Sequence, residues 1–361
     1  MSETVAAEVF RVARESIVVL PPPFDGVIAE ARAQRRRRRR TVLASVAAAA
    51  AVVAGVGWAA TRPPTEEPTD SRWTVIRQPN PVDVAWYAGG QLHLAKVTVA
   101  MPAIGDLVAV EDGAAFTDAT GTVYFAAADG AVTELGRTGA QDRVAASDQT
   151  DWVAWVDPSG DVPRLVVHNL VSGEDFATRD LAEGGAVVAV DQARVYYTTP
   201  AGDFVWEPGQ DPVRLERTGL LDVESGAQVY AADDGIDMVQ AFFSTSLVRP
   251  GVGAMISPGG SFVLSRAGAR ATPFRPLLYA VRTGDRMRSG LSGGELALGA
   301  TFGPNHTVSY LVAPRADLGS GPDLDGNTEP LVVLRTCDLT PVVCHDVIPL
   351  ARRGERPLLA H

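Results

Sequence analysis

The chain has 361 residues, of which 46 % are hydrophobic and 21 % charged, enough for one large or two medium globular domains. Its net charge of −11 is unevenly distributed, because residues 1–40 hold nine arginines against five acids and the remainder carries −15. An acidic remainder of this size argues against nucleic acid or an anionic membrane surface as its partner.

The first 40 residues contain two short helical patterns. Val5, Val9 and Val12 recur at helical spacing within residues 3–16, with charged residues opposite them. Three prolines at 21–23 end this helix, and a second one leads from residue 26 into the six arginines at 35–40. Such a tail would either dock a cytosolic partner through the three valines or lie on the inner membrane leaflet, and the pattern favours neither.

Residues 41–61 are predicted to form a single transmembrane helix. These 21 residues contain no charge and no proline, and at 1.5 Å per residue they span roughly 30 Å, the thickness of a hydrocarbon core. The preceding arginines predict a cytoplasmic N-terminus and an extracytoplasmic C-terminal domain. A cleaved signal peptide is the alternative, but it would need an unusually long basic region and lacks a clean cleavage site.

The rest of the chain is predicted to be all-β. Residues 62–81 are rich in proline and acids, which indicates a stiff spacer. Residues 82–361 show short β-branched and aromatic runs separated by Gly, Asp, Pro and Asn. Similar units begin near residues 106, 142, 185, 221, 252 and 293, each with the strand content of one β-propeller blade. A half-unit at 82–103 leaves six or seven blades open; a tandem of β-sandwiches is the alternative fold.

The two cysteines, Cys337 and Cys344, flank a turn-like segment between two apolar runs. An even cysteine count outside the cytoplasm predicts a disulfide. A pair of reduced thiols would be expected in a cytosolic protein, and a zinc site would need two more ligands where only His345 is near.

No pattern of catalytic or cofactor-binding residues emerges from the sequence. The five histidines are far apart, and no nucleophile elbow or phosphate-binding loop is present. Asp323, Asp325, Asn327 and Glu329 alternate around a glycine as calcium ligands do, but they lie in a loop-like insertion and do not complete a calcium-binding motif. We expect neither a cofactor nor a metal, and a solvated loop at 323–329.

Two features of the chain carry a resemblance to known proteins. The segments SPGGSFVLS at 257–265 and DPSGDVPRLVV at 157–167 resemble blades of WD40-like propellers of the Tol-system type, although no Trp-Asp dipeptide ends them. The whole plan, from PPPFDGVIAEARAQRRRRRR through the Ala-rich apolar stretch to the C-terminal cysteine pair, is similar to actinobacterial single-pass membrane proteins. Some of those are associated with extracytoplasmic-function sigma factors, so the resemblance implies a sigma factor as a cytosolic partner.

The sequence therefore predicts a non-enzymatic membrane protein whose extracytoplasmic propeller binds an envelope ligand or protein. Signalling through residues 1–40 to a cytosolic partner is one extension of this function. An extracytoplasmic hydrolase or lyase on the same scaffold is the alternative, which converging histidine and acidic side chains at one channel mouth would favour. An envelope scaffold without signalling is a third possibility.

Overall fold

The computed structural model describes residues 73–139, 142–147, 150–240, 245–268, 273–314, 332–350 and 357–361, which belong to one compact unit, Pro68–His361. These residues form seven antiparallel sheets and, within the described ranges, no helix. None of the described residues belongs to a helix long and apolar enough to cross a membrane. The predicted span at 41–61 and the tail at 1–40 lie outside the described residues.

We call the sheets blades A to G in the order in which the chain enters them. Blade A takes strands from both ends of the described chain: β1 (Thr74–Ile76), β2 (Trp86–Ala88), β3 (Gln91–His93), β4 (Thr98–Ala100) and β29 (Leu358–Leu359). Blade B consists of β5 (Ile104–Val110), β6 (Gly113–Asp118), β7 (Thr122–Ala127) and β8 (Val132–Arg137). Blade C consists of β9 (Ala145–Ala146), β10 (Trp152–Asp157), β11 (Arg164–Asn169) and β12 (Glu174–Asp180). Blade D consists of β13 (Ala186–Asp191), β14 (Arg194–Thr199), β15 (Gly202–Trp206) and β16 (Val213–Arg214). Blade E consists of β17 (Leu220–Glu224), β18 (Ala227–Ala232), β19 (Gly235–Gln240) and β20 (Thr245–Arg249). Blade F consists of β21 (Val252–Ile256), β22 (Phe262–Ala267), β23 (Arg275–Ala280) and β24 (Arg286–Met287). Blade G consists of β25 (Glu295–Gly303), β26 (Thr307–Pro314), β27 (Val332–Leu339) and β28 (Val342–Leu350).

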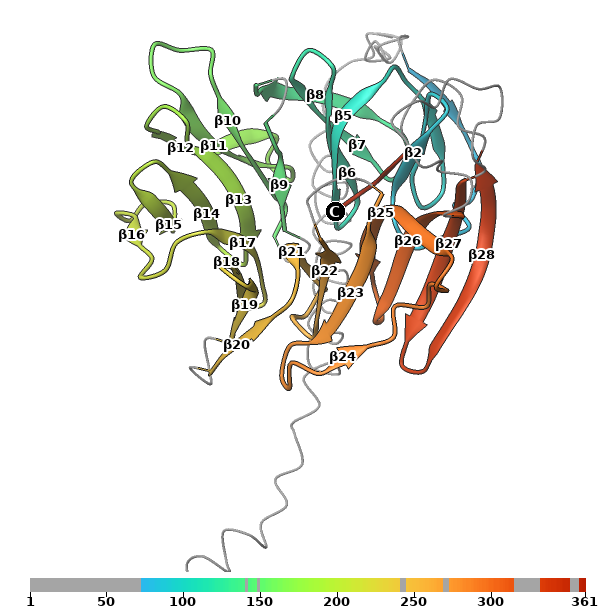
Figure 1. Ribbon diagram of the computed structural model, residues 1–361. Helices are drawn as coiled ribbons and strands as arrows, with labels where there is room; N and C mark the ends of the chain where they lie inside the picture. Colours follow the sequence, from blue (N-terminus) through green and yellow to red (C-terminus); the bar gives the residue numbers. More distant parts are fainter. Residues whose placement is uncertain are drawn as a thin grey trace, which may run out of the picture. The chain divides into compact units, whose positions relative to one another are not determined.

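The blades form a closed ring. Seven separate hydrophobic clusters are present, and each joins one blade to the next, including the cluster that joins blade G back to blade A. Each strand alternates its side chains between two faces, so both faces of a blade bury apolar residues against its two neighbours. Figure 1 shows the blades following one another around an axis that the C-terminal residues approach. The molecule is therefore a seven-bladed β-propeller.

A strand from the C-terminal side closes the ring. Leu358 and Leu359 of β29 pair with Tyr87 and Trp86 of β2, which makes β29 the innermost strand of blade A. At the outer edge of the same sheet, β1 pairs with β4. Residues 82–103, which the sequence left as a half-unit, thus supply the three middle strands of blade A, and β1 and β29 form its two edges. Strand β1 lies within the stretch that the sequence assigned to a spacer, 62–81.

The innermost strands share a local irregularity. In blades B, D, E, F and G the pairing of the first strand with the second shifts by one residue near the start of the strand. Such bulges re-aim the residue that follows them. In blades B and E that residue is an aspartate, Asp106 and Asp222. The repeat therefore places two acids at matching positions near the axis.

Candidate functional site

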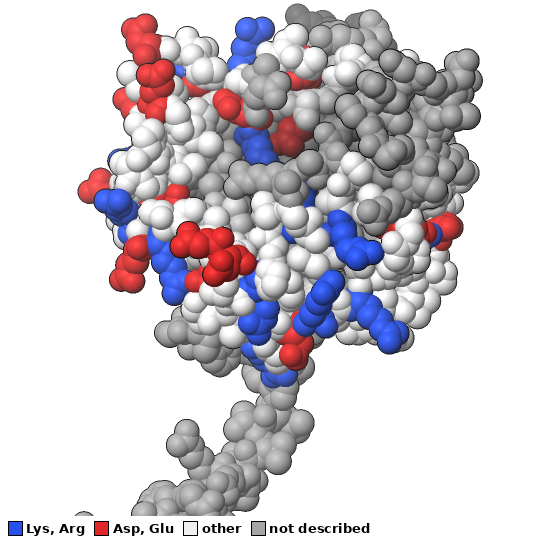
Figure 2. Space-filling view, viewed as in Figure 1, with Lys and Arg blue, Asp and Glu red and all other residues white. Residues whose placement is uncertain are grey.

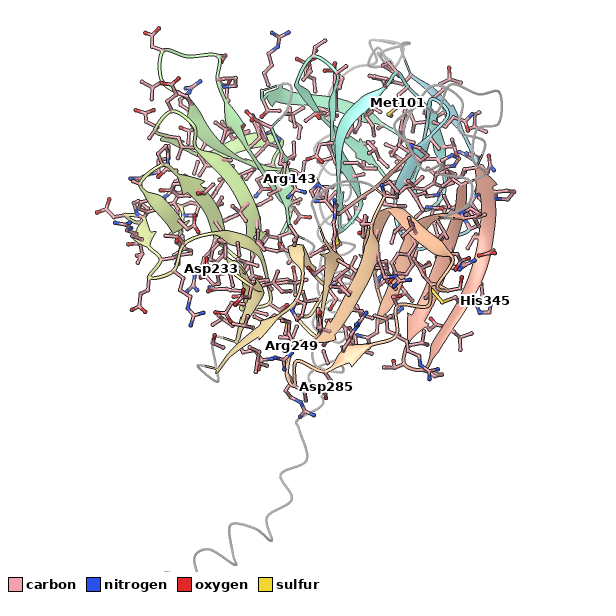
Figure 3. The ribbon with its side chains drawn as sticks, in the orientation of Figure 1. Met101, Arg143, Asp233, Arg249, Asp285 and His345 are labelled. Atoms are coloured by element: carbon pink, nitrogen blue, oxygen red, sulfur yellow. A yellow bond between two sulfur atoms is a disulfide. The ribbon has the colours of Figure 1, made fainter. Side chains whose placement is uncertain are left out.

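A narrow channel lies along the propeller axis. A cavity of about 150 Å³ lies there, lined by the first strands of blades B to G and by His361. Many of its wall residues are alanines, but Arg143, Asp222 and Glu224 also line it. Arg143 lies near the centre of the ring in Figure 3. Small-molecule sites usually enclose about 300–1,000 Å³. A second cavity of about 390 Å³ shares Arg143 and Leu221 with this one, so the space around the channel reaches that range.

Asp106 and His361 form a pair beside this channel. The Nε2 atom of His361 lies 2.9 Å from Oδ1 of Asp106, and Oδ2 of Asp106 accepts the main-chain N–H of Val144 at 3.0 Å. Burial alone would raise the pKa of Asp106, but the charge and hydrogen bond of His361, the Val144 N–H and Arg143 together lower it to about 2. Asp106 is therefore an ionised acceptor that joins blade B both to blade C and to the C-terminal residues.

The pKa of Asp222 is shifted in the opposite direction to that of Asp106. Its carboxylate accepts main-chain N–H groups of Ile256 at 2.7 Å and Val223 at 2.9 Å. Burial nevertheless dominates and raises the pKa of Asp222 to about 6, against the lowering effects of these N–H groups, His361 and Arg143. Such a carboxyl can exchange a proton near neutral pH, a property that enzymes use for general acid catalysis.

The hydrogen bonds of the channel acids nevertheless favour a structural role. Asp191 and Asp203 of blade D likewise accept main-chain N–H groups from blade E, at 2.7 to 3.0 Å. Carboxylates that bind the backbone of the next blade recur around the ring and hold neighbouring blades together.

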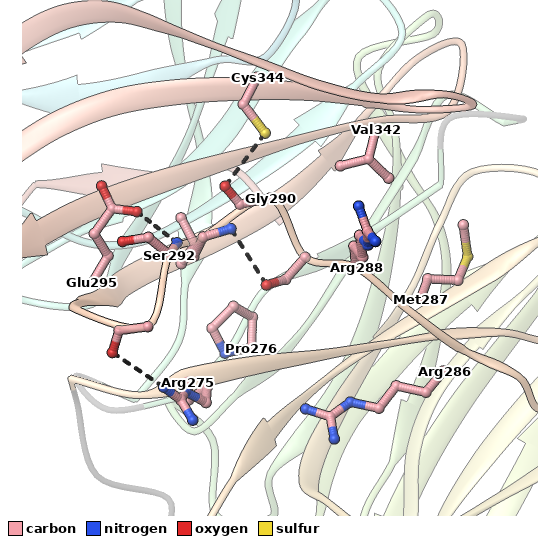
Figure 4. Close-up of a pocket in the computed structure, with 13 residues that line it drawn as sticks. Arg275, Pro276, Arg286, Met287, Arg288, Gly290, Ser292, Glu295, Val342 and Cys344 are labelled. Atoms are coloured by element: carbon pink, nitrogen blue, oxygen red, sulfur yellow. Dashed lines mark hydrogen bonds between the residues drawn. The ribbon is translucent and has the colours of Figure 1, made fainter.

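A larger concavity lies at the outer side of blades F and G. It has a volume of about 780 Å³ and is lined by Arg275, Arg286, Arg288, the loop Ser289–Gly293, Glu295, Val342 and Cys344. We call it the arginine groove. Figure 4 shows the three arginines on β23, β24 and the segment that follows β24, with Cys344 on the opposite wall. This volume falls within the usual range for ligand sites.

Two arginines of the groove are unpaired within the described structure. Arg275 donates to the Gly293 carbonyl at 3.2 Å, and Glu295 is bound by Arg335 at 2.9 Å. By contrast, Arg286 and Arg288 are exposed, and their guanidinium groups form no ion pair or hydrogen bond with any described residue. Exposed guanidinium groups without a partner in a concave surface are suited to carboxylates or phosphates.

The disulfide forms part of the wall of this groove. Cys337 and Cys344 are directly opposite each other on β27 and β28 and are bonded, which confirms the predicted disulfide. Gly290 lies on the two sulfurs with a φ of +81°, and a Cβ atom at this position would come within 2.2 Å of Cys344 Sγ. The loop that carries Ser289 is thus seated on the disulfide through a residue that has no side chain.

The charge distribution sets this region apart from the rest of the propeller. From Met238 to Gly284 the chain holds five arginines and no acid, and after Asp285 come Arg286 and Arg288. Residues 73–237, by contrast, carry 26 acids and nine basic residues. Figure 2 shows several Lys and Arg side chains gathered toward the lower end of the visible face, and acids interspersed with basic side chains on its left and upper parts. This acid-free run, which contributes Arg275 to the arginine groove, is the sign of the groove in the sequence, and the motifs considered above do not include it.

The remaining predicted residues fall in several places. Val5, Val9 and Val12, and the loop residues Asp323 to Glu329, lie outside the described residues. His93 is buried, stacked on Trp86 at 3.7 Å between ring centroids, and burial lowers its pKa to about 4. His168 pairs with Asp175 at 2.9 Å. In the described part of the chain, no three His, Cys, Asp or Glu side chains are grouped so that they could hold a metal ion.

Comparisons with known proteins support the fold. No family model and no curated sequence matches the chain. Among solved structures, the β-propeller domain of the trilobed protease from Pyrococcus furiosus is similar, with a TM-score of 0.53 and 9 % identity over 73 % of this chain and 90 % of that one. A structure of the mitotic checkpoint complex (TM-score 0.47, 12 % identity, covering 83 % and 90 %) and one of U3-55K (0.44, 13 %, 69 % and 82 %) are more distant. At such identities the likeness concerns the fold alone.

Proposed function

We propose that the chain is a single-pass membrane protein whose extracytoplasmic propeller binds an envelope ligand or protein through the arginine groove. In this proposal residues 1–40 are cytosolic, residues 41–61 cross the membrane and the propeller is not an enzyme. The observation that carries the binding role is the groove itself, an open concavity with two unpaired arginines on a propeller that is otherwise strongly acidic.

Two further observations support the proposed location. The arginine block before the apolar stretch favours a cytoplasmic N-terminus. The bond between Cys337 and Cys344 is of a kind that persists in oxidising compartments and is rare in the bacterial cytosol. Both observations support a propeller that lies outside the cytoplasm.

The channel supplies one specific observation in favour of a hydrolase or lyase. His361, Asp106, Asp222 and Arg143 converge on the axis, and the raised pKa of Asp222 suits a general acid. Against this function stand the main-chain N–H groups that both acids accept. We therefore keep catalysis as the second candidate, to be tested by whether Asp222→Asn abolishes any activity that the purified protein shows.

Residues 1–40 would allow the propeller to signal to the cytoplasm. Val5, Val9 and Val12 would form the apolar face of a helix that a membrane anchor alone does not require. In the signalling form of the proposal, occupancy of the propeller changes the contact between this face and a cytosolic partner, possible partners including a sigma factor. Without that contact the protein is a tethered binding module or an envelope scaffold.

In-cell photocrosslinking tests the binding role. A photoreactive residue replaces Ser289 in the groove, and the matched control carries it at Ser172, exposed on blade C. The proposal predicts a crosslinked species from position 289 that is absent from position 172 and that is lost in the Arg286→Gln, Arg288→Gln background. If both positions gave the same crosslinked species, or if neither position gave one, the groove would not be the binding face.

A further inference from the structure

Two free strand edges flank the arginine groove. β24 is the last strand of blade F and β28 the last strand of blade G, and residues of both line the groove. The outer side of such a strand carries main-chain N–H and C=O groups that no other strand of its sheet pairs. An extended peptide can add to an edge of this kind through main-chain hydrogen bonds.

The spacing of the arginines fits an extended ligand. Arg286 lies in β24 and Arg288 two residues further on. In extended backbone, side chains two residues apart share a face and are separated by roughly 6.5 Å. Carboxylates two residues apart on an added strand would have the same separation.

The wall between the charges is apolar. Met287 and Leu291 are partly buried and pack on the hydrophobic cluster between blades F and G, as does Cys344 of the disulfide. A peptide that alternates acidic and apolar residues would place one set of side chains near the arginines and the other against this wall.

We infer that the arginine groove binds an extended acidic peptide segment of a partner protein, which adds to the free edge of β24 and pairs its carboxylates with Arg286 and Arg288. This inference rests on the proposed binding function and names the chemistry of the ligand. The free edges favour a peptide over a polyanionic glycan, because a glycan would engage the arginines but leave the main-chain groups unused.

The test uses full-length protein in detergent and a fluorescent peptide of alternating glutamate and valine. Fluorescence anisotropy measures its affinity for the wild-type chain, for Arg286→Gln with Arg288→Gln, and for a control that removes the same charge from blade D, Arg194→Gln with Arg214→Gln. Since exposed ion pairs contribute modestly, we expect the groove variant to bind about fivefold more weakly and the control to be unchanged.

A second peptide separates strand addition from charge attraction alone. It has the same sequence but carries methyl groups on alternate main-chain nitrogens, which removes its hydrogen-bond donors on one edge. When the methylated edge faces β24, the methylated peptide should bind the wild type more weakly than the unmethylated peptide binds the Arg286→Gln, Arg288→Gln variant. Equal binding of the two peptides, equal effects of both arginine pairs, or no binding to the wild type would each overturn the inference. A groove-specific crosslink in cells would still stand in those cases, so failure of the peptide does not count against the binding function itself.

Discussion

The imidazole of His361 lies 2.9 Å from the carboxylate of Asp106, across 255 positions of sequence. The main chain reinforces this contact: His361 N–H donates to the Leu107 carbonyl, and the His361 carbonyl accepts from Ala109 N–H, both at 3.1 Å. β29 thus joins blade A through Trp86 and Tyr87, while the residue at the end of the described chain joins blade B. Ring closure depends on this double attachment.

Asp106→Asn should destabilise the propeller at neutral pH. The pKa of Asp106 is lowered from 3.8 in the unfolded chain to about 2 in the folded state. Its ionised form therefore stabilises the fold fully above about pH 3.8, and this stabilisation is lost as the pH falls through about 2. The loss at neutral pH is expected to be about 2 kcal/mol. Denaturant unfolding at neutral and acidic pH checks this, and the difference between the two proteins should narrow below about pH 4. A difference that does not change with pH would contradict the assignment.

Asp222→Asn should show the opposite dependence on pH. Because the folded pKa of Asp222 is raised to about 6, the folded state holds its proton more tightly than the unfolded chain does. Wild-type stability from this group is therefore fully present below its ordinary value of 3.8 and is lost as the pH rises through about 6. Relative to the Asn variant, the wild type should become less stable between about pH 4 and pH 6, and then remain level. If the stability of the wild type relative to the Asn variant rose over that interval, Asp222 would be ionised in the folded state.

Gly290→Ala should destabilise the loop that is seated on the disulfide. The new methyl group would come within 2.2 Å of Cys344 Sγ and 2.7 Å of Cys337 Sγ, so the loop has to move. Gly259→Ala is a matched control, because its φ is also +81° but no atom lies within 4 Å of its Cβ position. Both variants incur the cost of about 1 kcal/mol for the left-handed backbone, and only Gly290→Ala should lose a further 1–3 kcal/mol in thermal unfolding. Equal losses would mean that the contact with the disulfide does not constrain the loop.

Features that depend on neighbours in sequence were predictable. The turn at Ser257–Gly260 follows from its Pro and Gly residues, and Gly259 and Gly260 have φ of +81° and +70°. The disulfide also follows from local pattern, because its cysteines flank one hairpin turn and are seven residues apart. Repeat starts near 106, 142, 185, 221, 252 and 293 lie within a few residues of the first strands of blades B to G.

Features that depend on distant partners were not predictable in this way. β29 has only two residues, too few for a periodic signal, and its partner β2 lies at the other end of the propeller sequence. The Asp106–His361 pair and the position of Asp222 follow from ring closure and from the bulges. The acid-free run from Met238 to Gly284 was visible in the sequence, but only the fold places one of its arginines, Arg275, together with Arg286 and Arg288 in a groove that also includes Cys344 of blade G.

The signalling form of the proposal makes a prediction about the tail. Substituting Val5, Val9 and Val12 with Ser should abolish recovery of a cytosolic partner in pull-downs with residues 1–40, because the apolar face of the helix is lost. Membrane insertion should be unchanged, since residues 41–61 are untouched, and fractionation of the full-length variant provides that control. If the triple variant keeps every partner of the wild type, the tail does not signal through this face.

Membrane topology is the most direct test of the account, because the proposed function requires the propeller to be outside the cytoplasm. The chain has two cysteines and they are bonded to each other, so a new cysteine reports its own location. Val171→Cys places one on blade C, where the native side chain is 68 % exposed, and Ser16→Cys places one in the tail. In intact cells a membrane-impermeant maleimide should label Val171→Cys, whereas Ser16→Cys should require permeabilisation. Labelling of Ser16→Cys alone in intact cells would contradict the account.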